Sequence, residues 1–146
     1  MTVKRKRTVA AAPDAVWDLV SDPHHLPRWW PQVQRVEEVT DDAWTKVLRT
    51  PKGRTVRADY TRVEYRPGKR IVWQQEVEES PFEEILDEAV TTIELEPDGE
   101  DATRVELTAE QELRGRYRFG NFMLRRATRR QLDEALDGIE RAVGAE

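Results

Sequence analysis

The segment from residue 13 to residue 31 constrains the fold of this chain more than any other. Pro13 suits the first turn of a helix, because the N–H group that proline lacks would have no partner there. Ser21 or Asp22 can cap a second short helix that opens at Pro23, and the two prolines that follow prevent this helix from continuing. The segment therefore predicts two short helices, one directly after the other.

Three of the five tryptophans lie in this segment. Each indole that is buried removes on the order of 150 to 250 Å² of surface from water. We therefore expect the two helices to close one end of a curved sheet. Their apolar faces consist of Val16, Trp17 and Val20 in the first helix and of Leu26, Trp29 and Trp30 in the second.

Most of the remaining chain alternates between apolar and polar residues over short stretches that are separated by turn sequences. This alternation is typical of β-strands, and connections this short join antiparallel neighbours. The clearest turn is the Pro-Asp-Gly sequence at residues 97–99, after which the alternation resumes. The strands are expected at residues 3–9, 33–39, 44–50, 54–65, 71–77, 84–96 and 103–109.

The first of these strands carries a dense set of cations. If Val9 faces the interior, so do Arg5 and Arg7, because side chains alternate between the two faces of a strand. An inward arginine needs either a carboxylate partner or the anionic group of a ligand. Of these two alternatives, the sequence favours the carboxylate partner.

The last predicted element is a helix over residues 117–143, which is long enough to span the molecule at about 1.5 Å per residue. Its buried line comprises Leu132 and the apolar residues at positions 136, 139 and 143. Extended towards the start of the helix, this line leads through Thr128 to Arg125 and Asn121. We expect Arg125 to enter the space between helix and sheet, where it would meet a carboxylate, water or the acidic end of a ligand.

The composition excludes several classes of function. The chain of 146 residues has the length of one domain, and its net charge of −5 offers no general attraction for nucleic acid or an anionic membrane. It contains no cysteine, and its two histidines are adjacent, so that no metal and no cofactor are expected. No apolar stretch approaches the roughly 20 residues of a membrane span, and a cytoplasmic location is expected.

The helical segment near the start also carries a resemblance. The order Ala-Pro, Val-Trp, Ser-Asp-Pro and Trp-Trp between residues 12 and 30 resembles the opening of the START-like superfamily, in particular its polyketide cyclase/dehydrase and lipid-transport branch. The resemblance implies an α+β helix-grip fold. In this fold a curved antiparallel sheet of about seven strands wraps around a long C-terminal helix, with two short helices after the first strand. Residues 1–146 would form one such ligand-binding domain.

In a helix-grip fold the space between sheet and helix is either filled with side chains or left as a cavity. The sequence favours a cavity with polar groups on its wall, suited to a small apolar molecule that is lipid-like, aromatic or polyketide-like. The candidate ligand-binding residues are Trp29, Trp30, Tyr60, Trp73, Gln75, Asn121, Phe122 and Arg125.

Three functions fit these features of the sequence. The first is binding of the small apolar molecule without turnover. The second is a polyketide cyclase or dehydratase that uses no metal and no nucleophilic residue, and a pair of titratable residues facing inwards would favour it. The third is a protein-interaction module like the chaperone-activating or ribosome-associating relatives, for which an exposed apolar patch would be the sign. We expect no nucleic acid partner, no stable membrane insertion, and a monomer or weak homodimer.

Overall fold

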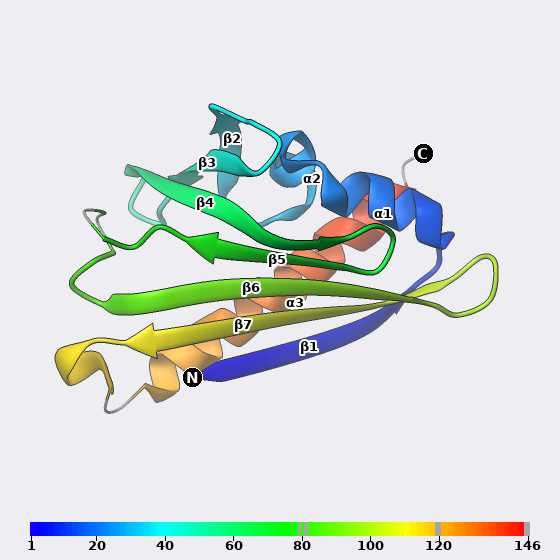
Figure 1. The fold of residues 1–146 in the computed structure, drawn as a ribbon. Coiled ribbons are helices and arrows are strands. Elements are labelled where there is room, and N and C mark those ends of the chain that lie inside the picture. Colours follow the sequence, from blue (N-terminus) through cyan, green and yellow to red (C-terminus); the bar gives the residue numbers. More distant parts are fainter. Residues whose placement is uncertain (79, 81, 119–120, 145–146) are drawn as a thin grey trace.

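The computed structural model describes residues 1–78, 80, 82–118 and 121–144. Seven antiparallel strands form one curved sheet, and a long helix crosses one of its faces (Figure 1). The strands are β1 (Thr2–Val9), β2 (Val33–Glu37), β3 (Ala43–Arg49), β4 (Thr55–Arg66), β5 (Arg70–Gln75), β6 (Leu86–Pro97) and β7 (Thr103–Leu113). The helices are α1 (Pro13–Ser21), the 3-10 helix η1 (Pro23–His25), α2 (Leu26–Trp29), the 3-10 helix η2 (Gly115–Arg118) and α3 (Phe122–Gly144).

The strand order across the sheet is β1-β7-β6-β5-β4-β3-β2. The strands β1 and β2 therefore form opposite edges, although they follow each other in the chain. The connection between these edges consists of α1, η1 and α2. The sequence predicts two short helices here, and the second of them is divided into the 3-10 helix η1 and α2. The helix α3 runs diagonally behind the sheet in Figure 1 and packs against β1, α1 and α2. The two short helices thus close the space between α3 and the sheet at one end.

The predicted α+β helix-grip architecture is confirmed, with seven antiparallel strands and a long terminal helix. The terminal helix starts at Phe122, however, and not at residue 117. Residues 117 and 118 of the predicted helix belong to the separate 3-10 helix η2, which opens at Gly115 with a φ of 59°, and residues 119 and 120 lie outside the described residues. Glycine adopts this left-handed conformation without steric cost, so the chain can leave the direction of β7 there.

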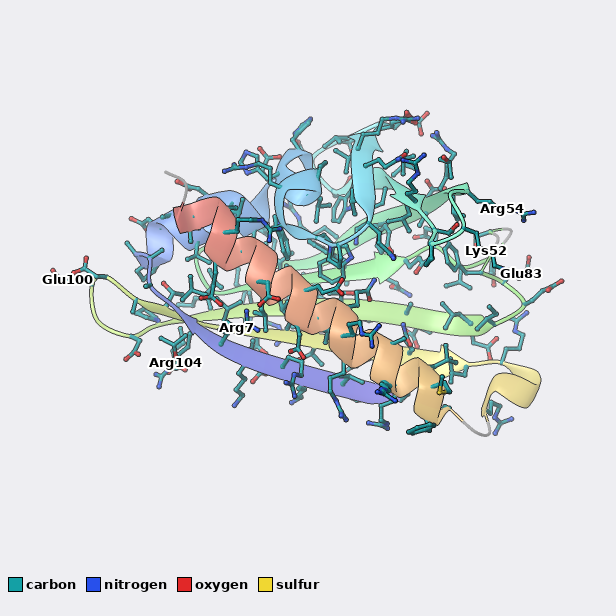
Figure 2. The ribbon with its side chains drawn as sticks, turned by 180° about the vertical axis from the view of Figure 1, so that it is seen from behind. Arg7, Lys52, Arg54, Glu83, Glu100 and Arg104 are labelled. Carbon is teal, nitrogen blue, oxygen red and sulfur yellow. The ribbon has the colours of Figure 1, made fainter. Side chains whose placement is uncertain are left out.

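The first strand confirms the prediction that its arginines pair with carboxylates. Val9 is buried, and the register of β1 with β7 places Arg5 and Arg7 on the same face. Arg5 forms an ion pair of 2.7 Å with Asp133 of α3. Arg7 pairs with two carboxylates of the same helix, and Figure 2 shows it where β1 passes beneath α3. Electrostatic attraction thus helps to hold α3 on the edge of the sheet.

The buried line of α3 agrees with the prediction in its C-terminal half. Leu132, Leu136 and Ile139 are fully buried, and Thr128 is buried as the last member of the line towards the start of the helix. Val143 is partly buried against the same core. No helix in the described part of the chain is long and apolar enough to cross a membrane.

The face predicted for the first helix is buried less completely than expected. Val16 and Val20 lie in the core, together with Leu19. Trp17 is only partly buried, and its ring packs at the border of the core against Tyr65 of β4, with a centroid distance of 5.6 Å. Trp17 therefore covers the core from the side and does not fill its centre.

Candidate functional site

A cluster of five aromatic rings fills the space that α2 closes. Trp73 of β5 lies at its centre, with ring-centroid distances of 5.4 Å to Trp44 and 5.8 Å to Trp30. Trp29 lies 6.1 Å and Tyr60 6.5 Å from the same ring. These distances are those of rings in contact, mostly with their planes tilted or perpendicular. We refer to these five residues as the aromatic cluster.

A lysine enters the aromatic cluster from β3. Lys46 is 1% exposed, and its ammonium lies 4.2, 4.3 and 4.8 Å from the ring centroids of Tyr60, Trp30 and Trp73. Among the described residues, the structure gives this ammonium no hydrogen bond and no ion pair. Burial lowers the pKa of Lys46 from 10.5 to about 7. The aromatic cluster therefore encloses an amine that can change its charge near neutral pH.

Lys46 is not among the candidates that the sequence predicts. The alternation of β3 places Lys46 on the same face as Trp44, and this spacing was the available signal. A lysine is almost never fully buried, so the residue type argued for the solvated face. Its position opposite Ala58 of β4 explains the burial, because this small side chain leaves room for the lysine stem.

Lys46 is expected to make the stability of the protein depend on pH. The folded protein binds this proton less tightly than the unfolded chain, so the free energy of unfolding should rise with pH above about 7. The contribution of one such group is at most about 1.4 kcal/mol per pH unit. This contribution is the difference in the free energy of unfolding between wild type and Lys46→Met. Urea denaturation at pH 6.5, 7.5 and 8.5 measures it.

The variant should be more stable than wild type at pH 6.5 and should lose this advantage as the pH rises. Lys52→Met is the matched control, because Lys52 is exposed in the turn between β3 and β4 (Figure 2). If the free energy of unfolding depended on pH in the same way in wild type and Lys46→Met, the prediction would be wrong. Lys46 would then bind its proton as tightly in the folded protein as in the unfolded chain.

Three buried groups, two on members of the aromatic cluster and one on the neighbouring Gln75, lack hydrogen-bond partners among the described residues. They are the indole N–H groups of Trp29 and Trp44 and the amide nitrogen of Gln75. Gln75 is buried on β5 and pairs in register with Tyr60 of β4. All three are hydrogen-bond donors, as is the ammonium of Lys46. A buried donor without an acceptor costs roughly 1 to 3 kcal/mol, so the site favours a molecule that supplies acceptors.

The structure brings together five of the eight residues that the sequence proposed for the site. Trp29, Trp30, Tyr60 and Trp73 belong to the aromatic cluster, and Gln75 lies beside Tyr60. Burial raises the pKa of the Tyr60 hydroxyl, so this group remains a neutral proton donor at physiological pH.

The other three residues lie at the start of α3, away from the aromatic cluster. The prediction that Arg125 enters the interior is wrong, because Arg125 is exposed and donates a hydrogen bond of 3.2 Å to the carbonyl of Thr2. Phe122 is 66% exposed, and Asn121 is half-buried at the margin of a surface depression. The physical reason is that the buried line of α3 ends at Thr128, beyond which the helix passes the start of the edge strand β1.

The surface has depressions both beside the aromatic cluster and away from it. One depression, of about 760 Å³, lies among charged residues of β1, β5, β6 and β7. Another, of about 270 Å³, lies between α2 and α3 and is lined in part by Trp29 and Trp30. Trp30 thus lines this depression and also contacts the ammonium of Lys46. The described part of the chain contains no group of three or more His, Cys, Asp or Glu residues placed to hold a metal ion.

A curved antiparallel sheet that encloses a long helix, with an aromatic cluster and polar groups between them, defines a helix-grip protein. The family described as polyketide cyclase/dehydrase and lipid transport matches residues 1–144. The chain therefore belongs to this family. A comparison with curated proteins finds no match.

Solved structures of several bacterial proteins share the fold. A START superfamily protein from Mycobacterium smegmatis has a TM-score of 0.82 at 14% identity, and the match covers 99% of this chain and 97% of that chain. The ZhuI aromatase/cyclase from a Streptomyces species has a TM-score of 0.81 at 18% identity, with coverages of 99% and 93%. A protein from Thermus thermophilus has a TM-score of 0.79 at 22% identity, with coverages of 99% and 98%.

Proposed function

We propose that this protein acts as a single ligand-binding domain for a small, largely apolar molecule held between the sheet and α3. The observation that carries the proposal is the aromatic cluster together with the unpartnered donors beside it. Rings supply apolar contact area, and a few buried polar groups orient the ligand, as in small-molecule sites generally. The proposed contact residues are Trp29, Trp30, Tyr60, Trp73 and Gln75, with Lys46 among them.

The depression between α2 and α3 supports a route for the ligand. Trp30 lines this depression and contacts the ammonium of Lys46, and α2 itself is only four residues long. A shift of this short helix would join the depression to the interior. The ligand would then replace contacts that the rings make with one another in its absence.

A neutral fluorescent probe tests the proposal without involving charge. N-phenyl-1-naphthylamine is expected to bind wild type saturably and with 1:1 stoichiometry. Trp30→Leu and Tyr60→Leu each remove an aromatic contact, so they should weaken binding about tenfold, the equivalent of roughly 1.4 kcal/mol. Fluorescence titration measures the dissociation constants, and circular dichroism verifies that each variant is folded.

Tyr65→Leu is the matched control, because Tyr65 is 41% exposed and packs against Trp17, outside the aromatic cluster. Its dissociation constant should equal that of wild type. Binding that never saturates, or an equal loss in all three variants, would contradict an internal site. If the probe binds wild type saturably and the two cluster variants weaken its binding, native mass spectrometry of protein purified from its own host would identify the retained molecule.

A cyclase-type reaction is a second candidate, and one observation favours it. Lys46 and Tyr60 form a pair of titratable groups that face inwards, with the ammonium 4.2 Å from the phenol ring. An amine whose pKa is about 7 can accept a proton, and a protonated phenol can donate one. Product analysis with a linear poly-β-ketone distinguishes the two functions, because only an enzyme converts it to a cyclised product.

A further inference from the structure

We propose that the ligand of this site is an organic acid with an apolar body, and that the ammonium of Lys46 binds its carboxylate. This inference rests on the proposed internal site and deepens it, because it names the chemical class of the ligand. It assigns to Lys46 the role of the residue that determines specificity.

The first argument is the energetic balance of the buried ammonium. Its contacts with the faces of Trp30, Tyr60 and Trp73 stabilise the cation. Removal of an ion from water carries a larger penalty even after the protein relaxes, and the described residues provide no counter-charge. A methionine of similar length would fill the same space without that penalty. A lysine at this position is therefore explained better by an anion that arrives from outside than by the stability of the fold.

The second argument is that the carboxylates of α3 that form ion pairs with the sheet are bound to other cations. Asp133, Asp137 and Glu140 of α3 are paired with Arg5 and Arg7 of β1. The rings that surround the ammonium come from the end of α2, from β4 and from β5, and none of them carries a negative charge at neutral pH. Since the described residues offer Lys46 no anion, the counter-charge is assigned to the ligand.

The third argument is the character of the neighbouring polar groups. The indole nitrogens of Trp29 and Trp44 and the amide nitrogen of Gln75 are buried donors without acceptors among the described residues. A carboxylate has two oxygens and about four lone-pair positions, so it can satisfy an ammonium and further N–H donors together. A cationic ligand would leave these donors unsatisfied and would be repelled by Lys46. The rings around them accommodate the apolar body of the acid.

The experiment compares an acid with a neutral compound of the same shape. The probes are 2-naphthoic acid and 2-naphthalenemethanol, and isothermal titration calorimetry at pH 6.5 measures both affinities. Lys46→Met should weaken binding of the acid by about 10- to 100-fold, as for the loss of a charge-assisted bond, and should change binding of the alcohol less than about threefold. Arg125→Met is the matched control, because it removes an exposed cation outside the aromatic cluster, and it should leave both affinities unchanged.

The pH dependence provides a second, independent readout. Affinity for the acid should fall about tenfold per pH unit above pH 7, because the free protein loses the charge of Lys46 there. At pH 8 the acid should bind with uptake of about one proton, visible as a dependence of the calorimetric enthalpy on the buffer. Tyr60, which faces the ammonium, stays protonated in this range. The same measurements on Lys46→Met remove the contribution of all other groups of the protein to this pH dependence.

The outcomes separate this inference from the proposed function. Binding of the alcohol with equal or weaker binding of the acid to wild type would overturn the assignment of an acidic ligand and would leave the internal site intact. An equal loss of both affinities in Lys46→Met would assign the lysine to packing alone and would also overturn the inference. Failure of both probes to bind wild type would contradict the internal site itself. Tighter binding of the acid, lost selectively in Lys46→Met, is the result expected.

Discussion

Replacement of Trp73 by alanine is expected to lower the free energy of unfolding by about 3 to 5 kcal/mol, the range for emptying a buried aromatic site. Trp73 is 3% exposed, and its ring contacts the four other members of the aromatic cluster. Because these rings come from strands as well as from α2, they cannot all move into the space that the indole leaves. The substitution therefore loses the free energy of burying the indole and also leaves a cavity, which destabilises the fold further.

Chemical denaturation of wild type and Trp73→Ala measures this loss. Trp73→Phe keeps an aromatic ring at the centre and should retain a substantial part of the stability. Tyr65→Ala truncates a partly exposed ring outside the aromatic cluster and should cost much less. An unchanged denaturation midpoint for Trp73→Ala would mean that the rings are loosely packed and that the interior holds open space around them.

Gly138→Ala is expected to destabilise the protein by about 3 kcal/mol or more, although alanine favours helices over glycine by about 1 kcal/mol. A Cβ atom at position 138 of α3 would lie 2.2 Å from the carbonyl oxygen of Trp29 and 2.8 Å from its Cα. The conflicting atoms belong to the backbone of α2, so no side-chain rotation relieves the overlap. The helix α2 would have to move away from α3, and Trp29 and Trp30 would move with it.

Gly144→Ala is the matched control, because it lies in the same helix and an added Cβ has no neighbour within 4 Å among the described residues. Thermal and urea denaturation should show a loss for Gly138→Ala and little change or a gain for Gly144→Ala. Equal stability of both variants would mean that α2 can shift without cost. Such a result would contradict the close contact between α2 and α3, and it would support an easily opened route to the interior.

The helices and strands could be predicted from the sequence because their signals are local. The prolines, capping residues and tryptophans of residues 13–31 are contiguous, and they predicted two short helices from the chemistry of helix ends. The structure divides the second of them into η1 and α2. The alternation of polar and apolar residues predicted all seven strands, since the period of a strand requires only its own residues. The pairing of Arg5 and Arg7 also followed, because an inward arginine requires a partner wherever it lies.

The start of α3 could not be predicted in the same way. Helical periodicity extended the buried line of this helix from Leu132 to Arg125, but periodicity does not state where the sheet beneath it ends. In the structure the line ends at Thr128, and Phe122 and Arg125 lie at the surface. Only the length and curvature of the sheet decided which turns of the helix it covers.

The site shows the same division between local and tertiary information. The residue types of Trp29, Trp30, Tyr60 and Trp73 identified them as candidates, because large aromatic side chains favour burial wherever the chain can provide it. Their meeting around Lys46 was decided by the tertiary structure, since the chain crosses from one edge of the sheet to the other and brings Trp29 and Trp30 against Trp73 of β5. A lysine on a strand prefers water when it is considered alone. It is buried here because the covering rings belong to segments distant in sequence, whose positions no local pattern contains.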